Sequence, residues 1–333
     1  MRRAPHGNGP EAGPLAAAAS EREAEPGPAY PARDQGRPLA GAPISWGVCE
    51  VPGWGRQLEP ERVLAEMASL GLTATELGPV GYLSLDADRV RALLDRFELR
   101  LVGGFVPLVL HTPSLDSARE VLDGVVPLLA ELGGEVLTVA PVMDADWSPP
   151  KTLDDGEWSL LAKNLERVED IASGHGLVTA LHPHAGSVVE TSDQIERALA
   201  ESDTQVCLDT GHLAIGGADP AAFVARHGAR VVHVHLKDVD SGLAGDVRAG
   251  RLSLVEATRA GLFRPLGRGH APIREVVGSL DRHGYERWLV LEQDTTITGE
   301  EPPVGRGPVL DVQVSIEYLA SLAPANGGGI QHQ

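Results

Sequence analysis

The sequence predicts an α/β protein built as a single (β/α)8 TIM barrel behind a disordered N-terminal extension. Strand-like and helix-like patterns alternate through eight βα units between residues 43 and 323, which is typical of a parallel sheet. Most of the helical segments are long enough for a crossover connection. Polar residues follow several of the apolar strands, where such barrels carry their sites. A doubly wound open sheet is the alternative, but the first βα turn, CEVPGWG, lacks a dinucleotide-binding glycine pattern.

The first four units are predicted from apolar strands followed by helical spacing. The first strand is expected at 44–49, and its helix at 60–70 has apolar residues at helical spacing and stops at Gly71. The next three strands are each paired with a helix: 73–77 with 86–97, 99–106 with 113–132, and 135–140 with 157–174.

The last four strands each lead into a polar residue. Residues 177–181 precede His182, 205–208 precede Asp209, 231–238 contain VVHVHLKD, and 287–291 precede Glu292. Their helices are expected at 192–200, 220–227, 272–283 and 310–322. A long loop at 239–271 separates the seventh strand from its helix.

The two ends have a different composition from the barrel. Residues 1–42 are rich in Ala, Pro, Gly, Glu and Arg, which predicts a disordered extension. They contain no apolar stretch typical of a secretory signal. Residues 324–333 are expected to form a flexible tail. The catalytic domain is therefore expected at 43–323.

Charge and cysteine content narrow the class of partner. The formal net charge of −19 disfavours nucleic acid and anionic membranes as partners. The only two cysteines, Cys49 and Cys207, favour a reducing compartment, and no apolar run approaches the roughly 20 residues of a membrane span. We expect a cytoplasmic protein that acts on a neutral or metal-complexed small molecule, and the sequence leaves homo-oligomer formation open.

The seventh strand carries an unusual run of ionisable residues. Because side chains alternate along a strand, His233, His235 and Lys237 share one face. On so apolar a strand these groups are costly unless they are paired, hydrated or metal-bound. A half-exposed edge strand is the alternative.

Four adjacent strands end in side chains that suit a divalent metal. We expect His182, Asp209, His235 and Glu292 to meet at one mouth of the barrel and to bind a cation with mixed imidazole and carboxylate groups. Any one of them alone would more often cap a helix or pair with arginine.

Further candidates surround this predicted metal site. Lys237, His212 and Glu76 are candidates for proton transfer. The candidates for substrate binding are His184, Trp46, His233 and Arg268. Trp46 could equally lie in the core. The segment 267–270, which holds Arg268, is either a lid over the substrate or a turn.

Several motifs resemble one known family. ISWGVCEVPGWG, ELGPVGYL, HPHAG, DTGHL, VHVHLKDV and EQD resemble the xylose-isomerase-like TIM-barrel superfamily, and within it the inosose-dehydratase branch. The resemblance covers about residues 43–322. It implies one divalent metal ion, Mn or Co being usual, with Mg or Zn as alternatives. The family's Glu, Asp, His, Glu ligand pattern maps to His182, Asp209, His235 and Glu292.

This chain departs from that pattern at His182, where many members carry Glu. His184, Glu190 or Glu76 are therefore alternatives for completing the metal shell. The resemblance also implies that His212 contacts the substrate.

The resemblance implies a metal-dependent dehydratase of a polyol ketone, with 2-keto-myo-inositol as the first candidate and an enediolate stabilised by the metal. A sugar or inosose isomerase or epimerase with the same metal site is the alternative. A metal-dependent DNA phosphodiesterase is disfavoured by the net charge of −19. An inactive binding protein is disfavoured because Asp209, His235 and Glu292 are all present.

Overall fold

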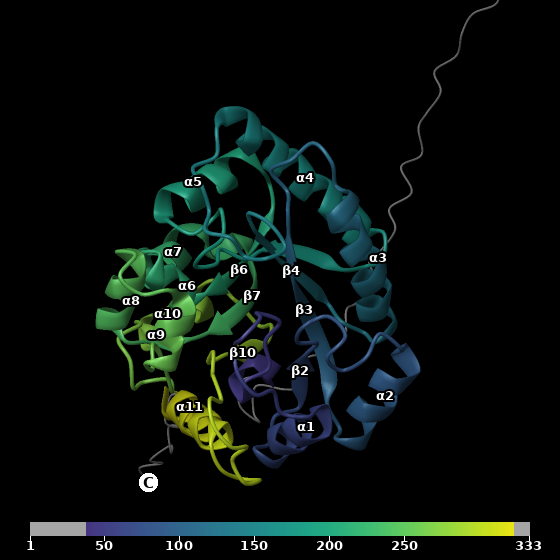
Figure 1. Cartoon of the computed structure of the whole chain (residues 1–333), viewed down its shortest axis with the longest axis vertical. Helices are drawn as coiled ribbons and strands as arrows, with labels where there is room; N and C mark the ends of the chain where they lie inside the picture. Colours follow the sequence, from purple (N-terminus) through teal and green to yellow (C-terminus); the bar gives the residue numbers. More distant parts are fainter. Residues whose placement is uncertain (1–37, 323–333) are drawn as a thin grey trace, which may run out of the picture. The chain divides into compact units, whose positions relative to one another are not determined.

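The computed structural model describes residues 38–322, and within them eight parallel strands close into a barrel (Figure 1). This arrangement confirms the predicted TIM barrel. The strands follow one another around the barrel in the order β1 (Leu39–Gly41), β10 (Leu289–Leu291), β7 (Val231–Leu236), β6 (Gln205–Asp209), β5 (Val178–Leu181), β4 (Val136–Pro141), β3 (Arg100–Leu108) and β2 (Ala74–Glu76).

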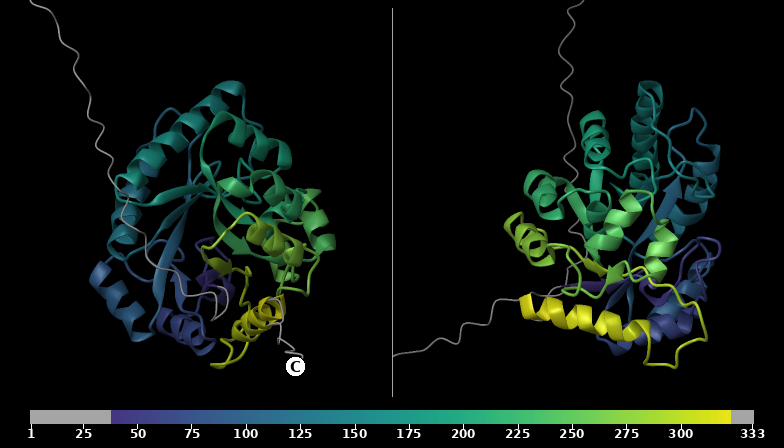
Figure 2. Two further views of the ribbon diagram at one scale, coloured as in Figure 1. Left: turned by 180° about the vertical axis from the view of Figure 1, so that it is seen from behind. Right: turned by 60° about the vertical axis from the view of Figure 1, so that its left-hand side comes forward.

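Helices lie around the outside of this barrel (Figures 1 and 2). Each follows the spacing that the sequence shows; for example, Ile273, Val276, Val277 and Leu280 form the buried face of one helix. The helices that follow the barrel strands are α1 (Pro60–Ser69), α2 (Ala87–Arg96), α3 (Asp116–Glu131), α4 (Asp155–Ser173), α5 (Ser192–Glu201), α7 (Pro220–His227), α10 (Ile273–Arg282) and α11 (Pro308–Leu322).

The prediction of the first strand is wrong. Residues 43–46 form the 3-10 helix η2 (Pro43–Trp46), which ends at Gly47 with a left-handed φ of 85°. The strand is β1, whose three residues pair with Leu289–Leu291. Of the three β1 residues, only Leu39 is large and apolar, and the surrounding sequence is rich in proline and glycine. The local pattern therefore does not indicate a strand there. The first barrel strand therefore lies inside the predicted 1–42 extension.

The rest of the predicted extension, residues 1–37, and the predicted tail after 323 lie outside the described residues. The other predicted barrel strands and their helices agree with the structure to within three residues at each end.

The predicted loop 239–271 contains secondary structure instead. It holds the antiparallel pair β8 (Asp238–Val239) and β9 (Phe263–Arg264), with α8 (Ser241–Arg248) and α9 (Leu254–Arg259) between them. A further short helix, α6 (Thr210–Ile215), follows β6 directly. The described part of the chain has no helix long and apolar enough to cross a membrane.

The barrel interior beneath the strand ends is filled by small side chains. Val136, Ala180 and Cys207 form a buried cluster there, packed against Val232. Cys207 and Asp209 lie on the same face of β6 because side chains alternate. Strand alternation therefore places packed apolar side chains in the barrel interior and ionisable side chains at the strand ends above them.

Candidate active site

Asp209, at the end of β6, has two separate structural roles. Its Oδ1 atom accepts hydrogen bonds from the backbone N–H groups of Gly211 (2.9 Å) and His212 (2.8 Å), which caps α6. Its Oδ2 atom is left to face the barrel mouth, where it lies 3.4 Å from His182 Nε2 and 3.6 Å from His235 Nδ1. The cap thus fixes the carboxylate in the orientation that the site needs.

The two residues after Asp209 hold β6 against the end of β7. Thr210 Oγ1 donates to the carbonyl of Lys237 (2.7 Å) and accepts from its backbone N–H (2.8 Å). A Cβ on Gly211 would lie 2.6 Å from Lys237 Cβ, so only glycine allows this approach. The DTG sequence is thereby explained residue by residue.

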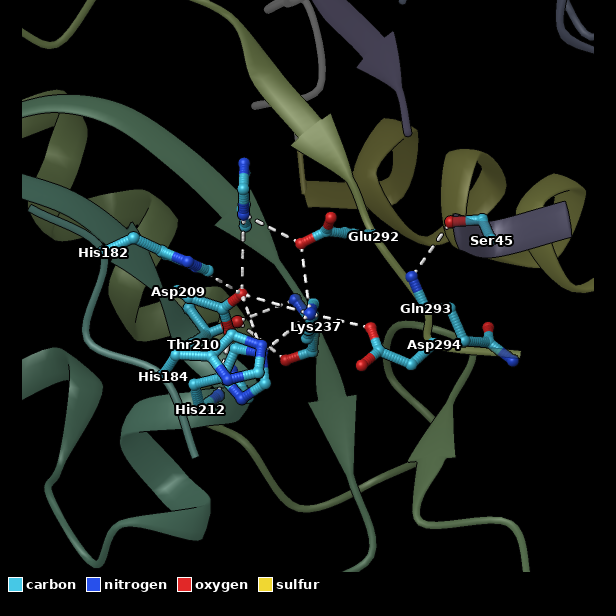
Figure 3. Close-up of polar contacts among 12 residues, drawn as sticks. Ser45, His182, His184, Asp209, Thr210, His212, Lys237, Glu292, Gln293 and Asp294 are labelled. Atoms are coloured by element: carbon cyan, nitrogen blue, oxygen red, sulfur yellow. Dashed lines mark hydrogen bonds and ion pairs between the residues drawn. The ribbon is translucent and has the colours of Figure 1, made fainter. Parts of the chain in front are cut away.

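Lys237 lies at the centre of the site (Figure 3). Its Nζ atom is 2.7 Å from Asp294 Oδ1, 3.1 Å from Glu292 Oε2 and 3.4 Å from Asp209 Oδ2. Burial opposes the charged form, but these three carboxylates raise the pKa of Lys237 well above its ordinary value. Lys237 is therefore a buried ammonium group at neutral pH.

Lys237 in turn affects the pKa values of the carboxylates around it. Burial alone would raise the pKa of Asp209, but the charge of Lys237 and the neighbouring histidines hold it well below its usual range. For Asp294 burial dominates over Lys237, and its pKa is raised to about 6. The two carboxylates thus differ in how readily they take a proton.

His235 lies between carboxylates on both sides of its ring. Nε2 is 3.1 Å from Glu76 Oε1, and Nδ1 is 2.8 Å from Glu292 Oε2. Burial opposes protonation, but Cys207, Glu292 and Glu76 together raise the pKa of His235 well above its ordinary value. Glu76 also accepts from His233 Nε2 (2.8 Å).

The charges of this cluster fit a divalent cation. Carboxylates outnumber the cationic groups: four carboxylates, Glu76, Asp209, Glu292 and Asp294, surround Lys237 and His235. The buried His182 Nδ1 atom makes no hydrogen bond to any described residue. The ligand atoms of Asp209, His235 and Glu292 all lie within 4.8 Å of one another. These donor types suit Mn²⁺, Co²⁺ or Zn²⁺.

The structure therefore brings the four predicted metal ligands together. His182 joins the others through its 3.4 Å contact with Asp209. Burial lowers the pKa of His182, and the ring is therefore neutral, as metal binding requires. Of the alternatives, Glu76 is engaged by two histidines. Glu190 Oε2 accepts from Gly186 N–H.

Two further histidines extend the site along one side. The rings of His184 and His212 lie 3.7 Å apart between centroids, and His212 Nε2 is 3.0 Å from Lys237 Nζ (Figure 3). Burial lowers the pKa of both histidines well below the ordinary value. His212 is therefore a neutral ring in contact with Lys237.

A cavity of about 600 Å³ opens above these groups. Its floor includes Glu76, His182, His184, Lys237 and Glu292. Its walls come from the segments after β1 and β4 and from α8–α9: Ile44, Val48, Trp54, Trp147, Leu252, Leu254.

Three predicted substrate-binding residues do not line this cavity. Trp46 is fully buried and donates its indole N–H to Glu66 Oε2 (2.9 Å), so it is a core residue. His233 lies beneath the floor against Glu76. Arg268 is exposed at the surface. Only His184 of this predicted set lines the cavity.

The loop that carries Arg268 is a structural turn. Asp238 Oδ2 accepts from the backbone N–H groups of Gly267 and Gly269, both at 2.9 Å, and its Oδ1 accepts from Ala271. A Cβ on Gly269 would lie 2.3 Å from Asp238 Oδ1. Because this segment is tied to a buried carboxylate, it cannot move as a lid without breaking three hydrogen bonds.

Three residues of the site are not among the candidates predicted from the sequence. Asp294 lies two residues after Glu292, and strand alternation could have identified it. Trp147 and Phe105 line the cavity beside His184. No local pattern distinguishes them from core aromatics.

Comparison with known proteins places this architecture in a family. The family described as "Xylose isomerase-like TIM barrel" matches residues 64–320. Rhizopine catabolism protein MocC of Rhizobium meliloti is 30% identical over 294 residues, covering 86% of this chain and 88% of that protein. Inosose dehydratase of Geobacillus kaustophilus is 30% identical over 294 residues, covering 84% and 93%. The crystal structure of IOLI protein with a bound zinc atom has a TM-score of 0.62 at 14% identity, covering 85% and 97%.

The family match spans most of the barrel, and the relatives extend over most of the chain. They confirm the predicted family and the prediction of an enzyme. This chain belongs to the xylose isomerase-like TIM-barrel family.

Proposed function

We propose that the protein is a metal-dependent dehydratase of a polyol ketone, with 2-keto-myo-inositol as the substrate. The observation that carries this proposal is the buried cluster of His182, Asp209, His235 and Glu292 around Lys237, of which His182, Glu292 and Lys237 line the floor of a cavity. The similarity to an inosose dehydratase over 84% of the chain supports the choice of substrate.

The four clustered side chains would hold Mn²⁺ or Co²⁺. A divalent cation bound there would act as a Lewis acid that polarises the ketone and eases loss of the neighbouring proton. Glu76 is then a positioning residue, since its Oε1 atom orients both His233 and His235.

The protein's own residues account for the proton transfers. Asp294 takes the α-proton, and the electron pair of the broken C–H bond delocalises onto the ketone oxygen as an enediolate. The pair then forms the new C=C bond as the β C–O bond breaks. Lys237 donates its proton to the departing hydroxyl, which leaves as water. Asp294 returns the proton to Lys237 across 2.7 Å, and the enol product tautomerises to a diketone.

Purified protein incubated with 2-keto-myo-inositol tests this proposal. We expect diketone absorbance with Mn²⁺ or Co²⁺, loss of activity with a chelator and recovery when metal is restored. Absence of product with metal restored would end the dehydratase assignment. A sugar isomerase or epimerase would return a proton to carbon from the same floor, so ketose substrates followed by NMR in D2O distinguish solvent-proton exchange from loss of water.

A further inference from the structure

The cavity has two parts of opposite character. Its floor carries the ionisable side chains of the strand ends, whereas its upper walls are mostly apolar. At roughly 30 Å³ per water molecule, a volume of about 600 Å³ corresponds to about 20 waters. A single polyol ring on the floor would leave much of the upper part unfilled, with its apolar walls facing water.

The apolar walls come from different segments. One group of lining residues is Phe105 and Trp147, and another is Leu252, Leu254 and Val255 around the start of α9. Trp54 also lines the cavity and is fixed by its indole N–H, which donates to the carbonyl of Thr295 (2.7 Å). Apolar surfaces arranged around an opening favour an apolar ligand group between them.

Trp147 packs against neighbouring aromatic rings, one of which is His184 at the cavity floor. Its ring lies 4.9 Å from that of His184, and it stacks on Phe105 at 6.4 Å with an interplanar angle of 21°. Trp147 also has a left-handed φ of 56°, which is uncommon for a bulky residue and costs about 1–3 kcal/mol. The Asp144 carboxylate supports this turn by accepting from the N–H groups of Asp146 and Ser148.

The charges that line the cavity exclude an acidic substrate. Six carboxylates line it: Glu50, Glu76, Asp146, Glu190, Glu292 and Asp294. Among its described lining residues the one lysine or arginine is Lys237, and three carboxylates already surround that ammonium group. Away from the cation proposed at the floor, a phosphate ester would meet repulsion from these carboxylates without a free cationic side chain as partner.

We infer that the site also accepts uncharged polyol ketones that carry an apolar substituent, such as an aryl group, which packs against Trp147 and the apolar residues around the start of α9. This inference rests on the proposed polyol-ketone chemistry and extends its substrate class. The polyol ring faces the floor, and the substituent occupies the upper cavity. Phosphorylated sugars are rejected.

Binding of unreactive probes tests the inference without relying on turnover. We would titrate the full chain, loaded with Mn²⁺, with phenyl glucoside, methyl glucoside and a phosphate monoester of glucose, using calorimetry. The phenyl glucoside should bind about 10- to 100-fold more tightly than the methyl glucoside, because the ring buries apolar surface. The phosphate ester should show no binding. Equal affinities for the two glucosides, no binding of the phenyl glucoside, or binding of the phosphate ester would overturn the inference.

Variants identify the wall that is responsible. Trp147→Ala and Leu254→Ala should each reduce the preference for the phenyl glucoside, whereas Trp147→Phe should retain most of it. Leu310→Ala is the matched control, because Leu310 is an exposed leucine on α11 outside the cavity. Circular dichroism and thermal unfolding check that each variant folds. A preference unchanged in folded Trp147→Ala and Leu254→Ala would contradict the assignment.

The two proposals fail separately. Turnover of 2-keto-myo-inositol with no preference for the phenyl glucoside keeps the dehydratase and removes the apolar subsite. A preference that depends on Trp147, together with no turnover of 2-keto-myo-inositol, keeps the subsite and removes the proposed reaction.

Discussion

The floor and the walls of the cavity are built in different ways. The floor and the ionisable cluster beneath it come from the ends of β2, β5, β6, β7 and β10, where alternation and short motifs such as DTG set each side chain. The walls come from loops and from α8–α9, and their apolar residues meet only when distant segments fold together. Local sequence motifs can thus specify the residues of a chemical centre, whereas the shape of the cavity around it depends on packing between distant segments.

The largest effect on activity is expected from substitution of Asp209, one of the four proposed metal ligands. Asp209→Asn keeps an oxygen that can cap α6 but removes the negative charge that would hold the metal. We expect loss of metal binding and a fall in kcat of about 10³-fold or more, measured by metal titration and by dehydration kinetics.

Asp219→Asn is the control for this substitution. Asp219 caps α7 through Oδ1 bonds to the backbone N–H groups of Ala221 and Ala222, the same kind of cap outside the site. It should cost at most about 1 kcal/mol of stability and leave kcat unchanged. Equal losses of activity in both variants would mean that Asp209 acts only as a cap.

Lys237→Met separates proton transfer from metal binding. Removing the ammonium group should lower kcat by about 10²- to 10⁴-fold, because the leaving hydroxyl loses its proton donor. Metal affinity should stay equal or increase, since a competing cation is removed from Asp209 and Glu292. Parallel loss of metal affinity and kcat would show that Lys237 only supports the fold of the site.

Glu76→Gln tests a residue at the floor that contacts two histidines. His233 and His235 both lose a charged acceptor, so metal affinity should fall by about 10- to 100-fold. An unchanged affinity for Mn²⁺ in a titration would contradict the positioning role of Glu76.

The same variant makes a prediction about pH. Burial by itself would raise the pKa of Glu76, but His235 and His233 hold this pKa below its ordinary value of 4.5. The charge of Glu76 therefore stabilises the fold above pH 4.5, and that contribution is lost as the pH falls further. In metal-free protein, the stability difference between wild type and Glu76→Gln should therefore shrink below pH 4.5. Urea unfolding at several pH values measures it, and a difference that grows in acid would reverse the assigned sign.

The smallest effects are expected at the turn that carries Arg268. Asp238→Ala leaves four backbone N–H groups without their acceptor and should cost about 1–3 kcal/mol. Arg268→Ala should change stability by no more than about 0.5 kcal/mol and leave KM unchanged. A raised KM in Arg268→Ala would restore this residue as a substrate ligand.

Much of the barrel could be predicted because its pattern is local. Buried parallel strands are continuous apolar runs, and their helices show helical spacing. The exceptions lack such a signal: β1 has three residues, and Pro43–Trp46 has strand-like composition but forms a turn of 3-10 helix that ends at Gly47. Pairing of β1 with β10 outweighs its weak propensity.

The fold and the residue types that end β5, β6, β7 and β10 could be predicted from the amino-acid sequence, because strand alternation and barrel closure put these positions at one mouth. Three features followed only from the folded structure: Trp46 lies in the core, Arg268 faces solvent and Asp294 pairs with Lys237. The same holds for the aromatic residues that form the cavity walls. The reason is that a side chain's direction in a loop depends on distant contacts, as when Asp238 binds the segment around Gly269.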